Sequence, residues 1–239
     1  MKKLITAMMV AGLLGGTVTA AKAGGVTIDA TRIIYPADRH AATASLRNSS
    51  QEAVYLMQVA VSADPAQKKA APFLVTPPLF RLEPGNQNQV RIIKTSQALP
   101  TDRESLFWFT AKAIPLSTES DKHSRQSISG GIQFALAHTI KLMYRPSGLP
   151  MGPEQGFGAL RFKPTAEGIT VTNPSPYYIT FASLKVGGQE LMTQQQKANM
   201  VSPFSVLSFP LKGVHYPAKV SWKVINDLGG ESTYQGEIP

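Results

Sequence analysis

Residues 132–153 read IQFALAHTIKLMYRPSGLPMGP, a strand-like stretch followed by an abrupt break. From Ile132 to Tyr144 the residues are mainly aliphatic, β-branched and aromatic, which is typical of a β-strand. Three prolines and two glycines then fall between Pro146 and Pro153. Because proline cannot donate a backbone hydrogen bond, this stretch cannot continue a central strand. We therefore expect a domain boundary here.

Short strands separated by turns extend in both directions from this boundary. The upstream runs of strand length are residues 27–35, 44–48, 54–61, 79–82, 89–93, 105–114 and 132–144. The downstream runs are residues 160–162, 168–172, 178–186, 205–209 and 219–225. Seven upstream strands match the number in an immunoglobulin-like sandwich, and no long stretch after residue 23 has a sustained helical period. The sequence predicts an all-β chain with two β-domains.

The first 23 residues predict a signal peptide for export. Lys2 and Lys3 precede an uncharged stretch from residue 4 to residue 21, and the small residues Ala21 and Ala23 precede Gly24. Cleavage is expected before Gly24. The expected organisation is a signal peptide at 1–23, a first domain at 24–145, a linker at 146–153 and a second domain at 154–239.

Charge and composition restrict the partners that this chain can have. The formal net charge is +9, and removal of the three lysines in residues 1–23 leaves +6, with no block of five or six like charges. Nucleic acid is therefore not an expected partner. No later stretch is apolar over the length of a membrane span, so no insertion of the mature chain into a membrane is expected. With no cysteine, an exported chain must be stabilised by burial and not by disulfides.

The sequence offers no arrangement typical of catalysis or metal binding. The four histidines stand far apart, at His40, His123, His138 and His215. No Gly-x-Ser-x-Gly motif and no phosphate-binding glycine loop is present. A secreted hydrolase would need a nucleophile with a nearby base, and the sequence supplies no such pair. We expect no enzymatic activity, no cofactor and no metal.

The strand before the boundary has an alternating apolar face. Ile132, Phe134 and Leu136 lie on one face at a period of two residues. One interpretation is an ordinary half-buried strand that fills its own core. The other is a strand that extends beyond its own sheet, after the polar stretch from Ser117 to Arg125, and pairs with another chain.

Seven segments together resemble the periplasmic chaperones of the chaperone–usher pilus pathway. In sequence order they are TRIIY (31–35), TPP (76–78) with RLEPG (81–85), RESLFW (103–108), KAIP (112–115), IKLMYRP (140–146), NPSPYY (173–178) and INDLGG (225–230). Each segment is a weak signal alone, but their common order over nearly the whole mature chain is specific. The resemblance implies two immunoglobulin-like domains at an angle, in an L-shaped molecule with an interdomain cleft.

The resemblance also implies the roles of particular residues. Arg32 and Lys141 are similar to the pair with which the family anchors the C-terminal carboxylate of a pilus subunit, for which a guanidinium and an ammonium are suited. Ile132, Phe134 and Leu136 are similar to the donor residues of the family. A pilus subunit lacks the last strand of its fold, and the chaperone strand fills the resulting groove.

Three charged residues, Glu104, Arg145 and Asp227, match a trio that the family places between its domains. Such a trio implies a fixed interdomain angle more than a large gain in stability, because buried ion pairs often barely offset their desolvation. On a regular strand Lys141 would face away from the donor residues, so we expect a bulge or twist near His138 to Ile140.

The loop between Pro115 and Ile140 indicates the subclass of the family. It contains 24 residues, and the chain has no cysteine, whereas long-loop members usually carry a disulfide. We therefore expect the short-loop (short F1–G1 loop) subclass.

The implied function is that of a periplasmic chaperone. It would bind pilus or fimbrial subunits after export, complete their fold, prevent premature polymerisation and deliver them to the outer-membrane usher. The exposed apolar edge is compatible with a self-capping homo-oligomer of the free protein. The alternative is a structural adhesin or pilus subunit, but the chain has no alternating arm before Thr27 and no cysteine.

Overall fold

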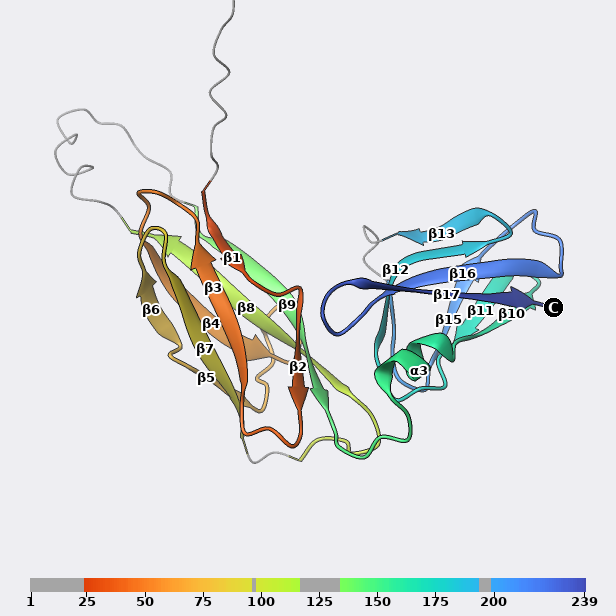
Figure 1. The fold of residues 1–239 in the computed structure, drawn as a ribbon, viewed down its shortest axis with the longest axis horizontal. Coiled ribbons are helices and arrows are strands. Elements are labelled where there is room, and N and C mark those ends of the chain that lie inside the picture. Colours follow the sequence, from red (N-terminus) through yellow and green to blue (C-terminus); the bar gives the residue numbers. More distant parts are fainter. Residues whose placement is uncertain (1–23, 96–97, 117–133, 194–198) are drawn as a thin grey trace, which may run out of the picture.

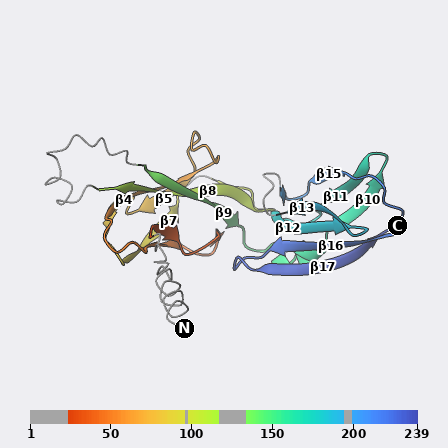
Figure 2. The same ribbon diagram turned by 90° about the horizontal axis from the view of Figure 1, so that it is seen from above.

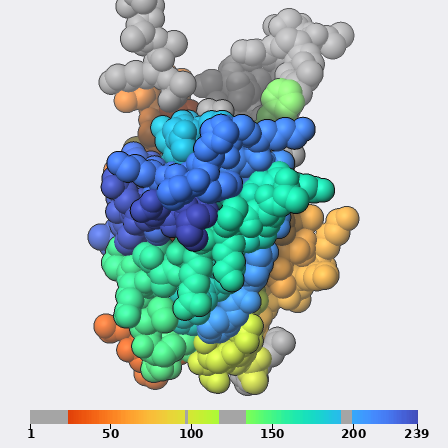
Figure 3. Space-filling model, turned by 90° about the vertical axis from the view of Figure 1, so that its right-hand side faces the viewer, coloured from red at the N-terminus to blue at the C-terminus, as the bar shows by residue number. Residues whose placement is uncertain are grey.

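The computed structural model describes residues 24–95, 98–116, 134–193 and 199–239. In this part of the chain the structure is made of β-strands and one short helix, arranged as two domains set at an angle (Figure 1). None of the described helices is long and apolar enough to cross a membrane. Viewed from above, the two domains follow one another along the long axis of the molecule (Figure 2). Viewed along that axis, the second domain (green to blue) covers most of the first domain behind it (Figure 3).

The first domain is a sandwich of two sheets. Its strands are β1 (Val26–Ile28), β2 (Arg32–Pro36), β3 (Ala42–Asn48), β4 (Tyr55–Ser62), β5 (Phe73–Thr76), β6 (Leu79–Leu82), β7 (Gln87–Lys94), β8 (Ser105–Pro115) and β9 (Leu136–Arg145). One sheet has the order β1-β3-β7-β5 and the other the order β2-β9-β8-β4-β6. Alternate side chains of each strand point between the sheets, and Leu46, Ile92, Phe109 and Leu142 are fully buried there.

The structure corrects the expected first strand. The run 27–35 is two strands, because the chain bends after Ile28 and continues as β2 in the other sheet. β1 pairs antiparallel with β3, whereas β2 pairs parallel with β9. Both halves carry apolar residues at period two, so the sequence pattern alone contains no sign of the change of sheet.

The second domain is a smaller sandwich. Its elements are α3 (Pro153–Gly158), β10 (Arg161–Thr165), β11 (Gly168–Thr172), β12 (Ile179–Val186), β13 (Gln189–Thr193), β14 (Met200–Val201), β15 (Val206–Pro210), β16 (Ala218–Ile225) and β17 (Glu231–Ile238). One sheet has the order β10-β11-β15 and the other the order β13-β12-β16-β17, with β14 paired to β12. The buried indole of Trp222 donates a hydrogen bond to Phe157 O (3.0 Å), which fixes α3 against the core.

Candidate functional site

Strand β9 changes its surroundings halfway along its length. β8 pairs with it from Leu136 to Tyr144, but β2 pairs with it only from Lys141 to Arg145. Among the described residues, no strand lies on the β2 side of residues 136–140. The backbone there is a free sheet edge, which can pair with another chain.

The free half of β9 and the residues before it expose large apolar side chains. Phe134 is 73% exposed and Leu136 is 57% exposed. Ile132 lies outside the described residues. Leu136 lies on the same face of the strand as Leu142, which is buried in the core of the first domain. The structure therefore places the apolar face of β9 inside the domain at one end and in solvent at the other.

The expected bulge near His138 to Ile140 is wrong. The β8–β9 register is unbroken from the Ala113–Leu136 pair to the Ser105–Tyr144 pair. A regular strand alternates its side chains, so Lys141 faces away from the apolar face that carries Leu136. No bulge is present, and the apolar face and the lysine are on opposite sides of one regularly paired strand.

Arg32 and Lys141 are direct neighbours across the β2–β9 pair. Both reach the second domain: Arg32 Nη1 donates to Ile225 O (2.7 Å), and Lys141 Nζ donates to Thr180 Oγ1 (3.2 Å). Among the described residues, none accepts a hydrogen bond from the buried Nε of Arg32. Two cations are therefore held side by side by neutral acceptors, and the buried Nε of Arg32 is available to a further acceptor.

The electrostatics of this pair favour an added anion. Burial, and secondarily the charge of Arg32, lower the pKa of Lys141 to about 8. Burial also lowers the pKa of Arg32, against the opposing effects of Asp227 and Glu104. A carboxylate placed between the two cations would offset both effects, because an opposite charge favours the charged form.

A second group of charges joins the two domains next to this pair. Arg145 Nε donates to Glu104 Oε1 (2.8 Å), and its two terminal nitrogens donate to the Asp227 carboxylate (2.6 and 2.7 Å). The other Glu104 oxygen accepts from Tyr178 N of the second domain (2.8 Å). The structure thus brings together the three residues that the sequence only aligns with a family motif.

The pKa values of this trio reflect burial and pairing. Burial raises the pKa of Glu104, against the lowering effects of Arg145 and the Tyr178 amide. Burial alone would lower the pKa of Arg145, but its hydrogen bonds and charge interactions with Asp227 and Glu104 raise it above its usual value. The guanidinium is therefore a permanently charged connection between the domains.

Several contacts at the domain junction were not found from the sequence. Thr180 and Ile225 hold the two cations, as described above. In a further contact, the Arg103 guanidinium lies over the Phe204 ring, 4.9 Å from the ring centre. Phe204 has a φ of 52°, a left-handed conformation that is uncommon for a non-glycine residue. No local pattern signals these residues, because each acts across the domain boundary.

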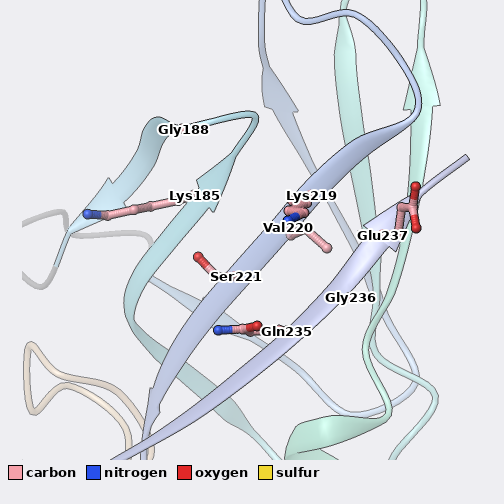
Figure 4. Close-up of a pocket in the computed structure, with 8 residues that line it drawn as sticks. All are labelled: Lys185, Gly188, Lys219, Val220, Ser221, Gln235, Gly236 and Glu237. Carbon is pink, nitrogen blue, oxygen red and sulfur yellow. The ribbon is translucent and has the colours of Figure 1, made fainter.

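The surface also has a hollow of about 680 Å³ on the second domain (Figure 4). Its lining comes from β12, β16, β17 and the turn after β12, and consists of Lys185, Gly188, Lys219, Val220, Ser221, Gln235, Gly236 and Glu237. No residue of β9 contributes to it. Within the described residues, no group of three histidine, aspartate or glutamate side chains is arranged to hold a metal.

Two immunoglobulin-like sandwiches, joined by an ion trio with one buried carboxylate beside a half-paired strand, define a class of two-domain binding proteins. The model of the pili and flagellar-assembly chaperone, PapD N-terminal domain, matches residues 25–150, and that of the pili assembly chaperone PapD, C-terminal domain, matches residues 155–236. The chain belongs to the PapD family of pilus-assembly chaperones.

Individual relatives agree with this assignment. The probable fimbrial chaperone protein ElfD of Escherichia coli O157:H7 is 36% identical over 232 residues, which cover 97% of this chain and 94% of ElfD. The chaperone protein FocC of Escherichia coli is 37% identical over 206 residues, which cover 86% of each chain.

Solved structures are similar over most of the chain. A chain of the complex of the Salmonella enterica SafA pilin with the SafB chaperone has a TM-score of 0.75 and 35% identity, and the match covers 92% of this chain and 99% of that one. The Escherichia coli chaperone DraB has a TM-score of 0.76 and 32% identity, with 90% and 97% covered.

Proposed function

We propose that this protein is a periplasmic chaperone that completes the fold of pilus subunits by lending them its strand β9. The observation that carries the proposal is the half-paired strand: β9 has neighbours on both sides from Lys141 to Tyr144 and on one side only before Lys141. A subunit that lacks a strand supplies the missing neighbour, and its unpaired backbone groups are satisfied in return. The protein has no catalytic role in this proposal and needs no cofactor or metal.

In this proposal the donor residues are Ile132, Phe134 and Leu136. The exposure of Phe134 and Leu136 supports the role, because large apolar side chains gain free energy when a partner removes them from water. Burial of one such side chain contributes about 1.5–3 kcal/mol. Ile132 lies outside the described residues, so its proposed role rests on the sequence resemblance.

The carboxylate at the end of the subunit is bound by Arg32 and Lys141. Their adjacency, the free Nε of Arg32 and the lowered pKa of Lys141 support an anion site. The trio Glu104, Arg145 and Asp227 fixes the angle at which the second domain approaches this site. The domain limits 24–145 and 154–239, with a linker at 146–153, belong to the same proposal.

The route of the protein completes the proposal. Residues 1–23 lie outside the described residues, and we propose that they direct export to the periplasm and are removed before Gly24. The chaperone then prevents premature subunit polymerisation and delivers its cargo to the outer-membrane usher, as a member of the short-loop subclass. Mass spectrometry of the periplasmic protein tests the cleavage position.

Co-purification from the periplasm tests the function. Wild-type protein would be expressed with the fimbrial subunits encoded beside it and compared with Lys141→Ala and Phe134→Ser. The matched controls are Lys219→Ala and Leu74→Ser, which alter an exposed lysine and an exposed leucine away from β9. We expect a one-to-one complex with wild type and both controls, and loss of the complex with both test variants. Capture by both test variants at the wild-type level would contradict the assigned site.

The free protein offers a second candidate behaviour, self-capping. The exposed edge of β9 and the side chains of Phe134 and Leu136 favour pairing between two copies when no subunit is present. Sedimentation of the subunit-free protein tests this. Association that disappears in Phe134→Ser supports self-capping through β9, and association that is unchanged in this variant places the contact elsewhere.

A further inference from the structure

The turn between β16 and β17 carries an unusually exposed apolar side chain. Leu228 is 97% exposed, the largest fraction among the exposed large apolar residues of the described chain. An isolated exposed leucine is common on protein surfaces. This one differs in its position, because the turn is attached to the first domain on both sides of Leu228.

The turn itself is rigid. Asn226 N donates to Gly230 O (2.8 Å), and Asn226 Oδ1 accepts from the amides of Leu228 (3.2 Å) and Gly230 (3.0 Å). Gly229 has a φ of 83°, and a Cβ on it would lie 2.4 Å from the Thr31 hydroxyl of the first domain. The glycine is required for both reasons, and the backbone of Leu228 is fixed by its neighbours.

Both flanks of the turn lie at the proposed anion site. On one side, Ile225 O accepts from Arg32, and Asp227 binds Arg145 through two hydrogen bonds. On the other side, Gly229 packs against Thr31, the residue before β2. Figure 1 shows this loop reaching from the second domain toward β2 and β9. Leu228 is therefore held beside the point at which β2 begins.

The free edge of β9 ends at the same point. The first β2 residue that pairs with β9 is Arg32, opposite Lys141. A chain that adds to residues 136–140 and places its terminal carboxylate at this pair must run parallel to β9 and stop where β2 starts. Its last side chains then lie beside Thr31 and the β16–β17 turn.

We propose that Leu228 is an apolar contact for the last residues of the bound chain, and that it favours chains with a large apolar side chain immediately before a free C-terminal carboxylate. The inference rests on the proposed function. Since the turn is already ordered, little conformational entropy is lost when Leu228 is covered, which favours binding. Its exposed surface contributes nothing to the stability of the free protein.

A peptide-binding experiment tests the contact. The probe is a labelled synthetic peptide with the sequence of the C-terminal strand of the fimbrial subunit encoded beside this chain and a free carboxylate. A second peptide has its last two side chains replaced by alanine, and a third ends in an amide. We expect Leu228→Ser to weaken binding of the first peptide by about 5- to 20-fold and of the second by less than about two-fold. Leu74→Ser is the control for loss of an exposed leucine elsewhere, and should bind like wild type.

The outcomes separate the inference from the function on which it rests. If Leu228→Ser binds the first peptide like wild type, while Lys141→Ala or the amide peptide shows a loss, the contact is overturned and the anchor stands. An equal loss with the first and second peptides also overturns the contact, because the effect would then be indirect. If wild type does not distinguish the carboxylate from the amide, or binds no peptide, both proposals fall.

Discussion

The two halves of β9 belong to one regular strand and have opposite environments. In the half 141–145, strands pair on both sides of residues 141–144, and Leu142 and Met143 are buried. The two charged residues of this half, Lys141 and Arg145, reach the second domain. In the half that begins at Leu136, only β8 pairs with the backbone, and residues 136–139 are exposed. The difference comes from the length of β2, which is too short to accompany β9 to its start.

This comparison shows that the same sequence pattern can stabilise a fold or serve a partner. Leu136 and Leu142 have the same residue type, the same strand and the same face, yet Leu142 packs in the core of the sandwich and Leu136 is exposed. A strand with one free edge is normally a risk for aggregation. In our proposal, the same free edge of β9 binds the pilus subunit.

The largest expected effect is a loss of stability when the Arg145 guanidinium, in the half of β9 that is paired with β2, is removed. Arg145→Ala leaves Glu104 buried without its cationic partner, and we expect a loss of about 3–5 kcal/mol in the free energy of unfolding. Urea unfolding measures it. The control is Arg91→Ala, at an exposed position on β7, which should change stability by less than about 0.5 kcal/mol. Equal losses in the two variants would show that the trio is not specifically important.

A leucine in each half tests the comparison directly. Leu142→Ala removes a fully buried side chain and should cost about 2–5 kcal/mol. Leu136→Ala should change the free energy of unfolding by less than about 0.5 kcal/mol, yet weaken capture of the subunit. Thermal unfolding and periplasmic co-purification, done on the same two variants, provide the two measurements. A large loss of stability in Leu136→Ala would mean that this half of β9 is already covered in the free protein.

A smaller effect concerns the lysine at the boundary of the two halves. In the folded protein the pKa of Lys141 is lowered from 10.5 to about 8. Between these two pH values the unfolded chain keeps the lysine proton and the folded protein does not. The contribution of Lys141 to the free energy of unfolding therefore rises as pH increases from about 8 to 10.5. Lys141→Met removes the cost of the buried charge and should stabilise the protein at pH 7 by about 1–2 kcal/mol, after allowance for partial solvent screening.

The pH dependence distinguishes removal of the lysine charge from a general gain in packing. The advantage of Lys141→Met over wild type in urea unfolding should shrink toward zero near pH 10, where the wild-type lysine is neutral. The same variant should lose subunit capture. A constant advantage at all pH values would instead indicate better packing by the methionine.

The smallest effect belongs to an exposed contact between the domains, Arg103 over Phe204. An exposed cation–π contact contributes about 0.5–1 kcal/mol. A double-mutant cycle with Arg103→Ala and Phe204→Leu should give a coupling free energy of this size in thermal unfolding. A coupling of zero would show that this contact does not stabilise the junction.

The sequence predicted much of this architecture, for identifiable reasons. The strands with strong apolar alternation, such as β4, β8 and β16, lie where the pattern indicated them. β17, from Glu231 to Ile238, was missed because its residues are mostly polar and exposed. β5, from Phe73 to Thr76, was missed because it is only four residues long and stands close to three prolines.

The site divides in the same way. Arg32, Lys141, Glu104, Arg145 and Asp227 could be named because they lie in segments that resemble a family. The acceptors of Arg32 and Lys141, and the ring that Arg103 contacts, could not be named from the chain alone. Thr180, Ile225 and Phe204 act through the orientation of the second domain, which short-range patterns do not encode.

The hydrogen bonds that hold the cation pair have a thermodynamic consequence. Arg32 and Lys141 belong to the first domain, but their acceptors, Ile225 O and Thr180 Oγ1, belong to the second. Any change in the interdomain angle therefore alters the arrangement of the cations, and so alters their affinity for an anion. Coupling of this kind is reciprocal: a ligand at the pair shifts the distribution of angles by the same free energy by which the angle shifts its affinity. In our proposal, a partner that changes the interdomain angle would therefore alter the binding of the subunit carboxylate without touching the pair itself.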